Sequence, residues 1–375
     1  MGRQIVNYLN DKQKGRLNKP TNVLFLLYVF LIIVAGVISD YVNSSMFKQF
    51  ALFCIPASLL GFKYGELGTI SSLVKYIDFF VIVLSVAFVL MMRNLVQLVG
   101  DGLASYSQTM SYYASLTILL NIFLLKYGHL YNRFKFFRTG IYKIISCLLL
   151  FPQLLALVMG GGRGATVVFI LGLFLIFIKD FIKNAHIFIR AVFIIMVVIT
   201  IIPKLNYFGI DGAADVVGKN FGRIIAVGEA GVDVYDRTSG RNFVYQDAIK
   251  AIEDNPLGYG MFSYEKQLPD QPYPHNIVLE WTMQWGVFYA LFQIVFLTLL
   301  FKHYRCCLLK DESLVILMPI LVYQFTALLF SGSYMQEPFY WFSITFLLNY
   351  NSKNRLVEQI PHSYENNIIS NNNVS

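Results

Sequence analysis

The sequence predicts an all-α, polytopic membrane protein, and three observations favour this fold class. The chain of 375 residues is 56% hydrophobic and only 14% charged, with a mean hydropathy of +0.56. Apolar runs long enough to cross a bilayer recur from end to end, about ten in all. The basic residues follow the alternation of inner and outer loops. We therefore expect about ten transmembrane helices and one long hydrophilic loop on the outer face.

The expected membrane spans are the apolar runs of the chain. By residue number they cover 22–39, 46–62, 76–92, 110–126, 141–159, 165–178, 190–203, 276–301, 314–331 and 335–350. A basic segment precedes the first run, and no small-residue cleavage site follows it. This arrangement indicates a retained signal anchor.

The one long hydrophilic stretch divides the chain into four parts. They are an N-terminal transmembrane bundle at 1–203, a long outer loop with short helices at 204–275, C-terminal transmembrane helices at 276–350, and a tail at 351–375. We expect about seven helices in the first bundle and about three in the second. The Asn-rich tail is expected to be disordered.

The distribution of basic residues predicts the topology. With the N-terminus placed in the cytoplasm and alternating spans, the inner segments hold 20 of the 30 Lys and Arg residues. The net charge of +8 is then a positive-inside signal, and it excludes nucleic acid as the expected partner. None of the four Cys residues falls in an outer loop, so we expect no disulfide framework. The chain has no recognisable metal or nucleotide motif, and we predict no cofactor.

His275 is the only one of the five histidines on the expected outer side. It lies in Pro274-His275-Asn276, directly before an apolar run. Asn276 and Glu280 are four residues apart, so they share one helix face. Glu280 lies at bilayer depth, where an ionisable group is costly and suggests a functional role. A structural hydrogen bond to a neighbouring helix is the open alternative for Glu280, and an interfacial polar residue is the alternative for His275.

Arg163 lies in a glycine-rich turn between two expected spans, within the segment Gly160-Gly161-Gly162-Arg163-Gly164-Ala165. Glycines let a backbone approach a ligand and expose its N–H groups, and a helix start favours an anion. Gly162 and Arg163 are therefore candidate anion-binding residues. The alternative is a tight turn with an Arg that extends towards the interface.

Arg241 follows Ser239-Gly240 at the start of a helix that we expect at 242–254. Tyr245, four residues on, would share its face. Arg223 and Arg237 are similar loop residues, and the sequence leaves open which of these arginines contacts an anion. Two guanidinium groups and an imidazole at one membrane face suit a substrate that carries phosphate on a lipid.

These motifs together resemble the O-antigen ligase and polymerase superfamily. The residues that carry the resemblance are Ser239-Gly240-Arg241, Tyr245, Ala248, Ile249, the segment Asn255-Pro256-Leu257-Gly258-Tyr259-Gly260, Pro274-His275-Asn276, Leu279-Glu280 and Gly286. Earlier ones are Gly162-Arg163-Gly164-Ala165, Tyr106-Ser107-Gln108 and Ser111-Tyr112-Tyr113. The resemblance covers about residues 95–300. Where the family often has Ser this chain has Gly162, and its usual loop Trp is Tyr245.

The resemblance implies a GT-C-like, O-antigen ligase-like architecture in the cell inner membrane, with both termini in the cytoplasm and the long loop in the periplasm. It also implies a metal-independent glycosyltransferase that cuts a glycan from undecaprenyl diphosphate and passes it to an acceptor hydroxyl. Arg163 and Arg241 would hold the diphosphate, with Arg223 as a further candidate. His275 would take or orient the hydroxyl proton, with a pKa near the working pH. Tyr245, Asn276 and Glu280 would position His275 or the sugar.

Three functions remain as alternatives. An O-antigen polymerase is favoured because of the motifs at 106–113 and the aromatic-rich, low-charge composition. A ligase would transfer the glycan to lipid A–core through the same residues. A lipid-linked oligosaccharide flippase is less favoured, because it would bury charges between two related halves. The expected partners are the undecaprenyl-diphosphate-linked oligosaccharide and membrane lipid, and a chain-length-determining copolymerase stays open.

Overall fold

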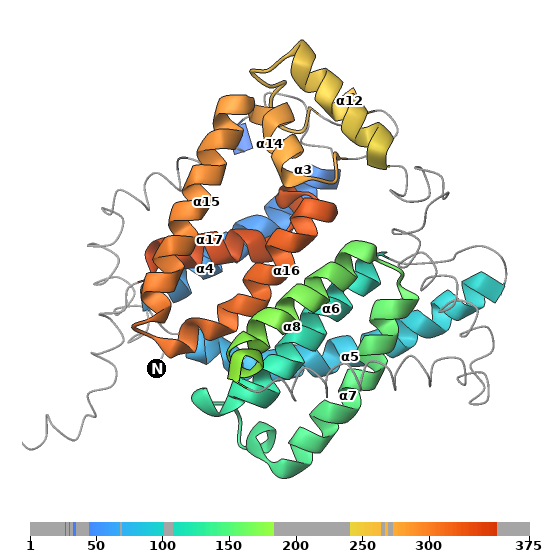
Figure 1. Cartoon of the computed structure of the whole chain (residues 1–375), viewed down its shortest axis with the longest axis vertical. Coiled ribbons are helices and arrows are strands. Elements are labelled where there is room, and N and C mark those ends of the chain that lie inside the picture. The colour runs from blue at the N-terminus through green and yellow to red at the C-terminus, as the bar shows by residue number, and fades with distance from the viewer. Residues whose placement is uncertain are drawn as a thin grey trace, which may run out of the picture.

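The computed structural model describes residues 45–67, 70–100, 108–183, 241–263, 267–268 and 273–350, with single positions 27, 30, 33 and 34. Every regular element in these ranges is helical (Figure 1). The first are α3 (Ser45–Gln49), the π-helix η2 (Phe50–Cys54), α4 (Ile55–Leu67), α5 (Ile70–Gly100), α6 (Gln108–Tyr127), α7 (Gly140–Met159) and α8 (Arg163–Lys183). The later ones are α12 (Arg241–Asp254), α14 (Ile277–Trp285), α15 (Val287–Leu308), α16 (Leu317–Phe330) and α17 (Pro338–Asn349).

Short 3-10 turns complete these elements. They are η3 (Gly128–Leu130), η4 (Phe136–Arg138), η7 (Glu312–Ile316) and η8 (Tyr334–Gln336). The helix expected at 242–254 is present as α12, which begins one residue earlier at Arg241.

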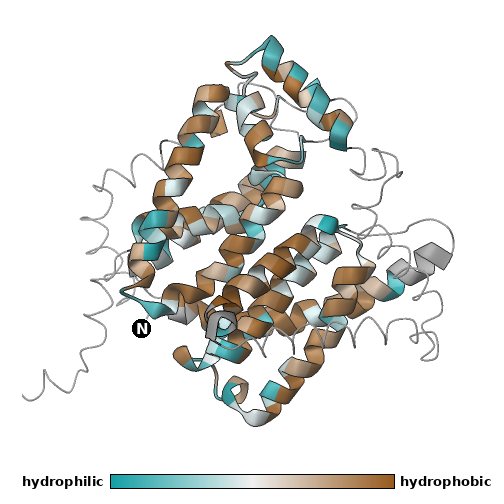
Figure 2. Cartoon of the chain, viewed as in Figure 1, coloured by the Kyte–Doolittle hydropathy of each residue, from teal (hydrophilic) through white to brown (hydrophobic). Residues whose placement is uncertain are grey.

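Among the described residues, five helical segments are long and apolar enough to cross a membrane. They are Leu73–Asn94, Gln108–Leu130, Gly140–Met159, Val287–Leu308 and Glu312–Phe330. Arg163–Ile178 is a shorter apolar helix. Figure 2 shows these helices hydrophobic along most of their length, whereas α12 is largely hydrophilic. The prediction of an all-helical, multi-pass membrane protein is confirmed at this level.

Some expected spans differ from the structure or lie beyond it. The runs at 22–39 and 190–203 fall almost wholly outside the described residues, as do residues 204–240 of the loop and the tail. The run at 335–350 contains α17, which has 12 residues and at about 18 Å is shorter than a bilayer core. The single span expected at 276–301 is wrong, because Gly286 divides it into α14 and α15.

The helix break at Gly286 is stabilised by the turn that follows α12. Backbone hydrogen bonds join Tyr259 N–H to Met283 C=O at 2.8 Å, and Val287 N–H to Pro256 C=O at 2.9 Å. Gly286 has φ +85°, and a Cβ there would lie 2.6 Å from Leu257 O. The turn therefore requires a glycine at this position, and it joins α12 to the α14–α15 junction.

Helices α4 and α17 pack against each other through two glycines. A Cβ on Gly61 would overlap the backbone oxygen of Phe342, and one on Gly65 would overlap that of Phe346. The Thr345 hydroxyl donates to Ser58 O at 3.0 Å. This is the spacing of small residues that brings membrane helices close together. It places one of the first described helices beside the last one (Figure 1).

A buried polar network links α5, α6 and α7. The Asn121 amide donates to Ser146 O at 2.9 Å and to Gln153 Oε1 at 3.2 Å. The Gln153 amide donates in turn to Ser85 Oγ at 2.7 Å. All four side chains are buried. Polar groups inside a membrane bundle find partners on neighbouring helices, so this network positions the three helices against one another.

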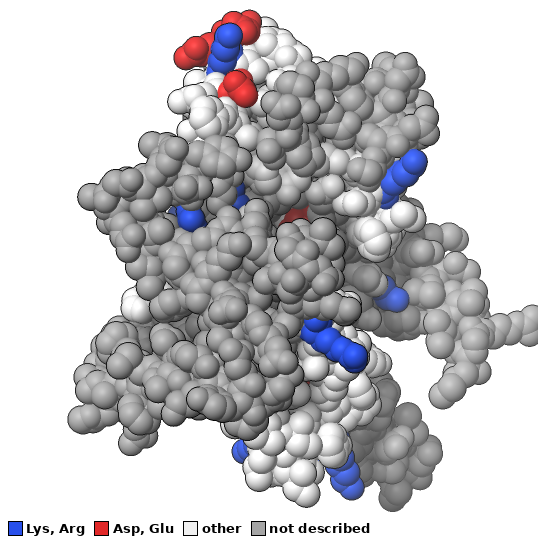
Figure 3. Space-filling view, turned by 90° about the vertical axis from the view of Figure 1, so that its right-hand side faces the viewer, with Lys and Arg blue, Asp and Glu red and all other residues white. Residues whose placement is uncertain are grey.

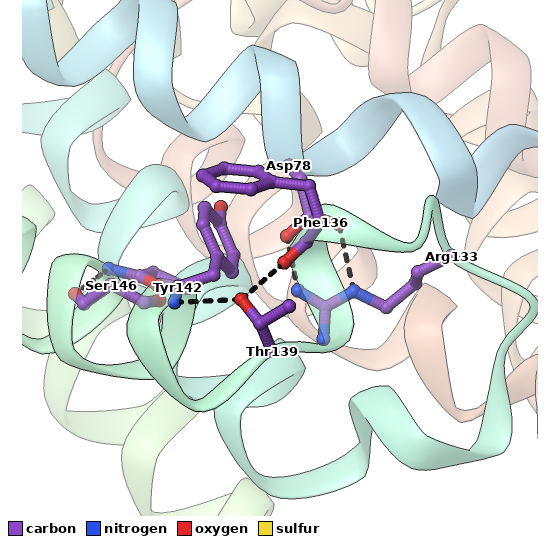
Figure 4. Close-up of polar contacts among 7 residues, drawn as sticks. Asp78, Arg133, Phe136, Thr139, Tyr142 and Ser146 are labelled. Carbon is purple, nitrogen blue, oxygen red and sulfur yellow. Dashed lines mark hydrogen bonds and ion pairs between the residues drawn. The ribbon is translucent and has the colours of Figure 1, made fainter.

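The end of the bundle formed by the α6–α7 and α15–α16 connections is basic and carries an ion pair. The Tyr131 hydroxyl joins the two connections by donating to Ser313 O at 3.0 Å. Arg133 forms a bidentate pair with Asp78 of α5, with Nε to Oδ2 at 2.8 Å (Figure 4). The side chains are 8% and 1% exposed. This pair attaches the α6–α7 connection to α5.

We predict that Asp78→Ala destabilises the protein by about 3–5 kcal/mol, because it leaves the Arg133 guanidinium buried without its counter-ion. Thermal or denaturant unfolding in detergent measures the effect. The double variant Asp78→Leu with Arg133→Met should recover much of the loss, since it buries no charge. A single variant as stable as the wild type would contradict the prediction.

Candidate active site at the other end of the bundle

The turn between α7 and α8 packs on the start of α6. The N–H of Gly162 donates to Ser111 Oγ at 3.0 Å, and that hydroxyl donates to Leu157 O at 3.0 Å. A Cβ on Gly164 would overlap the hydroxyl of Tyr112. The expectation that Gly162 exposes its N–H to a ligand is therefore wrong. These two glycines instead allow α8, which begins at Arg163, to approach α6.

Arg241 begins α12 and reaches across to the start of α6. Its Nη2 donates to Gln108 Oε1 at 3.2 Å. Its charge also acts on Tyr112, Tyr245 and His275. For Tyr245, burial raises the pKa, and Arg241 works in the opposite direction. The polar groups at this end of the bundle thus lie around the Arg241 cation. The motif at 106–113 contributes two of these groups, Gln108 and Tyr112.

Tyr273 and Ser331 complete the cluster, although the sequence motifs predict no role for either of them. Ser331 follows α16, and its side chain lies beside Tyr112 and Tyr273. Burial raises the pKa of Tyr273, as does the charge of Glu280, while Arg241 lowers it. The triplet at 111–113 could have pointed to Tyr112. No local pattern marks Ser331, because it reaches the site only through the packing of α16 against α6 and α8.

His275 is held directly before α14. Its φ is +55°, a left-handed conformation that is uncommon for a residue with a side chain. Its ring lies 4.4 Å from that of Tyr273, centroid to centroid. Burial, followed by the charge of Arg241, lowers the pKa of His275 to about 4. The expectation of a pKa near the working pH is therefore wrong for this structure, and the imidazole is neutral at pH 7.

Asn276 and Glu280 form structural hydrogen bonds in the elements around His275. Asn276 caps α14, because its Oδ1 accepts from Val278 N at 2.9 Å, and its amide donates to Leu329 O at 3.3 Å. Glu280 is fully buried. Its carboxylate accepts from the hydroxyl of Ser333 and from Tyr334 N at 3.3 Å. The open alternative, a structural hydrogen bond between elements, is thus the one observed for Glu280.

The structure therefore places Arg241 and His275 in one cluster with Tyr112, and Arg163 begins α8 at the same end of the bundle, next to Gly164, which packs on Tyr112. Tyr245 faces the same cluster. Arg223 and Arg237 lie outside the described residues. α12 exposes Asp247, Lys250 and Glu253 to solvent, and charged side chains of both signs stand out there at the top of Figure 3. In the described part of the chain, no group of three or more His, Cys, Asp or Glu could hold a metal ion.

A comparison with protein families places part of the chain in a known family. Residues 145–294 match the family model described as O-antigen ligase. The matched range contains Arg163, Arg241, His275 and the break at Gly286, and it confirms the resemblance inferred from the motifs. No curated protein and no solved structure matches the chain.

We predict that His275 titrates near pH 4 in the wild type, measured by NMR of ¹³C-labelled histidine in nanodiscs and assigned with His275→Gln. The unfolded chain takes up this proton near pH 6.5. The contribution of His275 to the free energy of unfolding is therefore lost as the pH falls from about 6.5 to about 4. Arg241→Ala should raise the midpoint without restoring it fully, because burial is the larger cause. A wild-type midpoint near pH 6.5 would contradict the structure.

Proposed function

Since residues 145–294 carry the O-antigen ligase family domain, we propose that this chain is an O-antigen polymerase of the cell inner membrane. It transfers a growing glycan from undecaprenyl diphosphate to an incoming undecaprenyl-diphosphate-linked repeat unit at the periplasmic face. The observation that supports this most directly is that Arg241 and His275 lie in one cluster with Tyr112, at the end of the bundle where Arg163 begins α8. The three come from separate elements of the matched family domain.

The arginines supply the binding and charge stabilisation for the donor. Arg163 starts α8, where the helix dipole also favours an anion. Arg241 starts α12 and is positioned by Gln108. A diphosphate between them would be held by planar, permanently charged guanidinium groups. These fixed cations stabilise the negative charge that grows on the leaving group, so the reaction is metal-independent in this proposal.

The transfer step is a substitution at the anomeric carbon of the donor sugar. The acceptor hydroxyl oxygen forms the new bond to that carbon, and the bond from the carbon to the diphosphate oxygen breaks. The electron pair leaves with undecaprenyl diphosphate, and the hydroxyl proton goes to His275. The neutral imidazole can accept this proton. A bound diphosphate would offset the charge of Arg241 and raise the pKa of His275 towards the working range.

The surrounding residues hold His275 in place. Asn276 and Glu280 act through α14 and the loop that follows α16, while Tyr245 and Tyr273 line the space next to Arg241. The proposed topology places both termini in the cytoplasm. It puts the basic α6–α7 and α15–α16 connections on the cytoplasmic side, in agreement with the positive-inside pattern.

The second candidate is an O-antigen ligase, which the description of the matching family favours. It would use the same arginines and the same histidine but transfer the glycan to lipid A–core. We favour the polymerase because the motif at 106–113 contributes Gln108 and Tyr112 directly to the cluster around Arg241.

The surface polysaccharide ladder of a deletion strain tests the function. We expect core bearing a single repeat unit, because ligation would still work without the polymerase. Bare core with polymer retained on the lipid carrier would assign the ligase instead. A ladder identical to that of the parent strain would contradict both.

Complementation with variants tests the site. Arg163→Ala and Arg241→Ala should each reduce polymer formation at least about 100-fold, since each removes a cation from the leaving group. His275→Ala should also abolish the ladder. Arg138→Ala, an exposed Arg at the opposite end of the bundle, is the matched control and should restore it. Normal ladders from both site arginine variants, at normal protein levels, would refute the proposed roles.

A further inference from the structure

The connection between α6 and α7 exposes aromatic and basic side chains together. It lies between the membrane-crossing segments Gln108–Leu130 and Gly140–Met159, at the end of the bundle opposite to the candidate active site. Phe134 and Phe136 are 42% and 53% exposed, and Lys135 between them is exposed as well. Exposed apolar side chains that gather in one place mark a surface for a partner or for a membrane.

The rings of this connection pack against the start of a membrane-crossing helix. The Phe134 ring lies 6.1 Å from that of Tyr76 and 5.6 Å from that of Phe79, centroid to centroid. Tyr76 and Phe79 are exposed and lie in the first two turns of the segment Leu73–Asn94. The buried ring of Phe137 packs on that of Phe79 at 4.8 Å. The connection therefore lies at the level where this helix enters the membrane, the level at which aromatic side chains are enriched.

The ion pair between Arg133 and Asp78 holds the connection on α5 (Figure 4). Both side chains are buried, so their charges offset each other and neither group is available to a ligand. The backbone of the connection is bonded as well, because the Thr139 hydroxyl donates to Phe136 O at 2.7 Å. The exposed side chains are thus presented by a backbone that is fixed in place.

The other cations of this region have no acidic partner. Lys135 and Lys143, the latter in the first turn of α7, are exposed. In the described part of the chain, no acidic side chain forms a salt bridge with either lysine. The sequence from 102 to 179 contains no Asp or Glu, so all its charged side chains are basic. Since Asp78 is already paired, the region carries a net positive charge that complements an anion.

Cations beside aromatic rings at the edge of a bilayer suit the headgroup of an anionic phospholipid. An ammonium group donates hydrogen bonds to phosphate oxygens, while the rings contact the part of the lipid next to its headgroup. We propose that Phe134, Lys135, Phe136 and Lys143, the basic–aromatic surface, bind an anionic phospholipid of the leaflet at this end of the bundle. This lipid is separate from the lipid-linked substrate of the proposed reaction, which would bind at the opposite end.

The affinity of the purified full-length protein for single lipids tests the basic–aromatic surface. Native mass spectrometry from detergent gives a dissociation constant for the first lipid bound, and it reports the oligomeric state at the same time. The two probes have identical acyl chains and are phosphatidylglycerol, which is anionic, and phosphatidylcholine, which is zwitterionic. We expect the wild type to bind phosphatidylglycerol about 10-fold more tightly than phosphatidylcholine.

The double variant Lys135→Gln with Lys143→Gln should weaken phosphatidylglycerol binding about 10-fold, because it removes two positive charges. Its phosphatidylcholine binding should stay unchanged, and its melting temperature should match that of the wild type, since both lysines are exposed. The double variant Phe134→Ala with Phe136→Ala should weaken the binding of both lipids alike, because the rings contribute apolar contact and no charge.

A matched pair of lysines at the same end of the bundle serves as the control. Lys302 in α15 and Lys310 directly after it are exposed. An exposed carboxylate, that of Glu312, follows two residues after Lys310 and repels an anionic headgroup. The double variant Lys302→Gln with Lys310→Gln removes the same charge as the lysine variant of the basic–aromatic surface, and it should change neither dissociation constant.

Three results would overturn the phospholipid site. One is equal affinity of the wild type for the two lipids. Another is an equal loss of phosphatidylglycerol binding in the control variant, since that result reports only the total charge at this end of the bundle. The third is a wild-type dimer that the Lys135→Gln and Lys143→Gln variant loses while it keeps its preference for phosphatidylglycerol, which would assign the surface to a second copy of the chain.

Discussion

The backbone contact between the turn at 256–260 and the helix break at Gly286 is the constraint on which the candidate site depends. It fixes the C-terminal end of α12 against the junction of α14 and α15, and Arg241 stands at the other end of α12. Asn276, which caps α14, fixes the position of His275 just before that helix. This turn thus helps to fix the position of the helix that Arg241 begins relative to the helix that His275 precedes. Space requires glycines at two positions of this contact, since a Cβ on Gly258 would lie 2.6 Å from the nitrogen of Gly286, and one on Gly286 would lie 2.6 Å from the oxygen of Leu257.

A second constraint comes from the buried carboxylate of Glu280. It binds Ser333 and Tyr334, and it thereby holds the loop that carries Ser331 towards Tyr112. An ionised group in such a position is stable only when its hydrogen bonds are satisfied. The loop after α16 is consequently part of the site although it contributes no charge of its own to the arginine cluster.

Much of the fold and part of the site could be predicted from the sequence. Apolar runs locate helices well, and the short motifs single out Arg163, Arg241 and His275 as candidates. The division of the run at 276–301 could not be predicted, because hydropathy does not show that a distant turn docks at Gly286. The glycines at 160–164 predict a ligand-binding backbone, whereas in the structure Gly162 and Gly164 provide space for Ser111 and Tyr112 of α6. The pKa of His275 depends on burial and on Arg241, and neither is visible in a local pattern. Ser331 lies beside Tyr112 and Tyr273, which are distant from it in sequence, so only tertiary packing reveals it.

The close packing of α4 against α17 has a consequence for how the chain assembles. Ser58 and Thr345 are 287 residues apart, and the surface around Gly61 and Gly65 is completed by the last described helix. During synthesis this surface of α4 stays uncovered until α17 has been made and inserted. A chain that stops before α17 leaves the small residues of α4 facing lipid, with which they make poor contact. Other helices can then pack on this surface instead. α17, the last described helix, therefore completes the packing surface of α4.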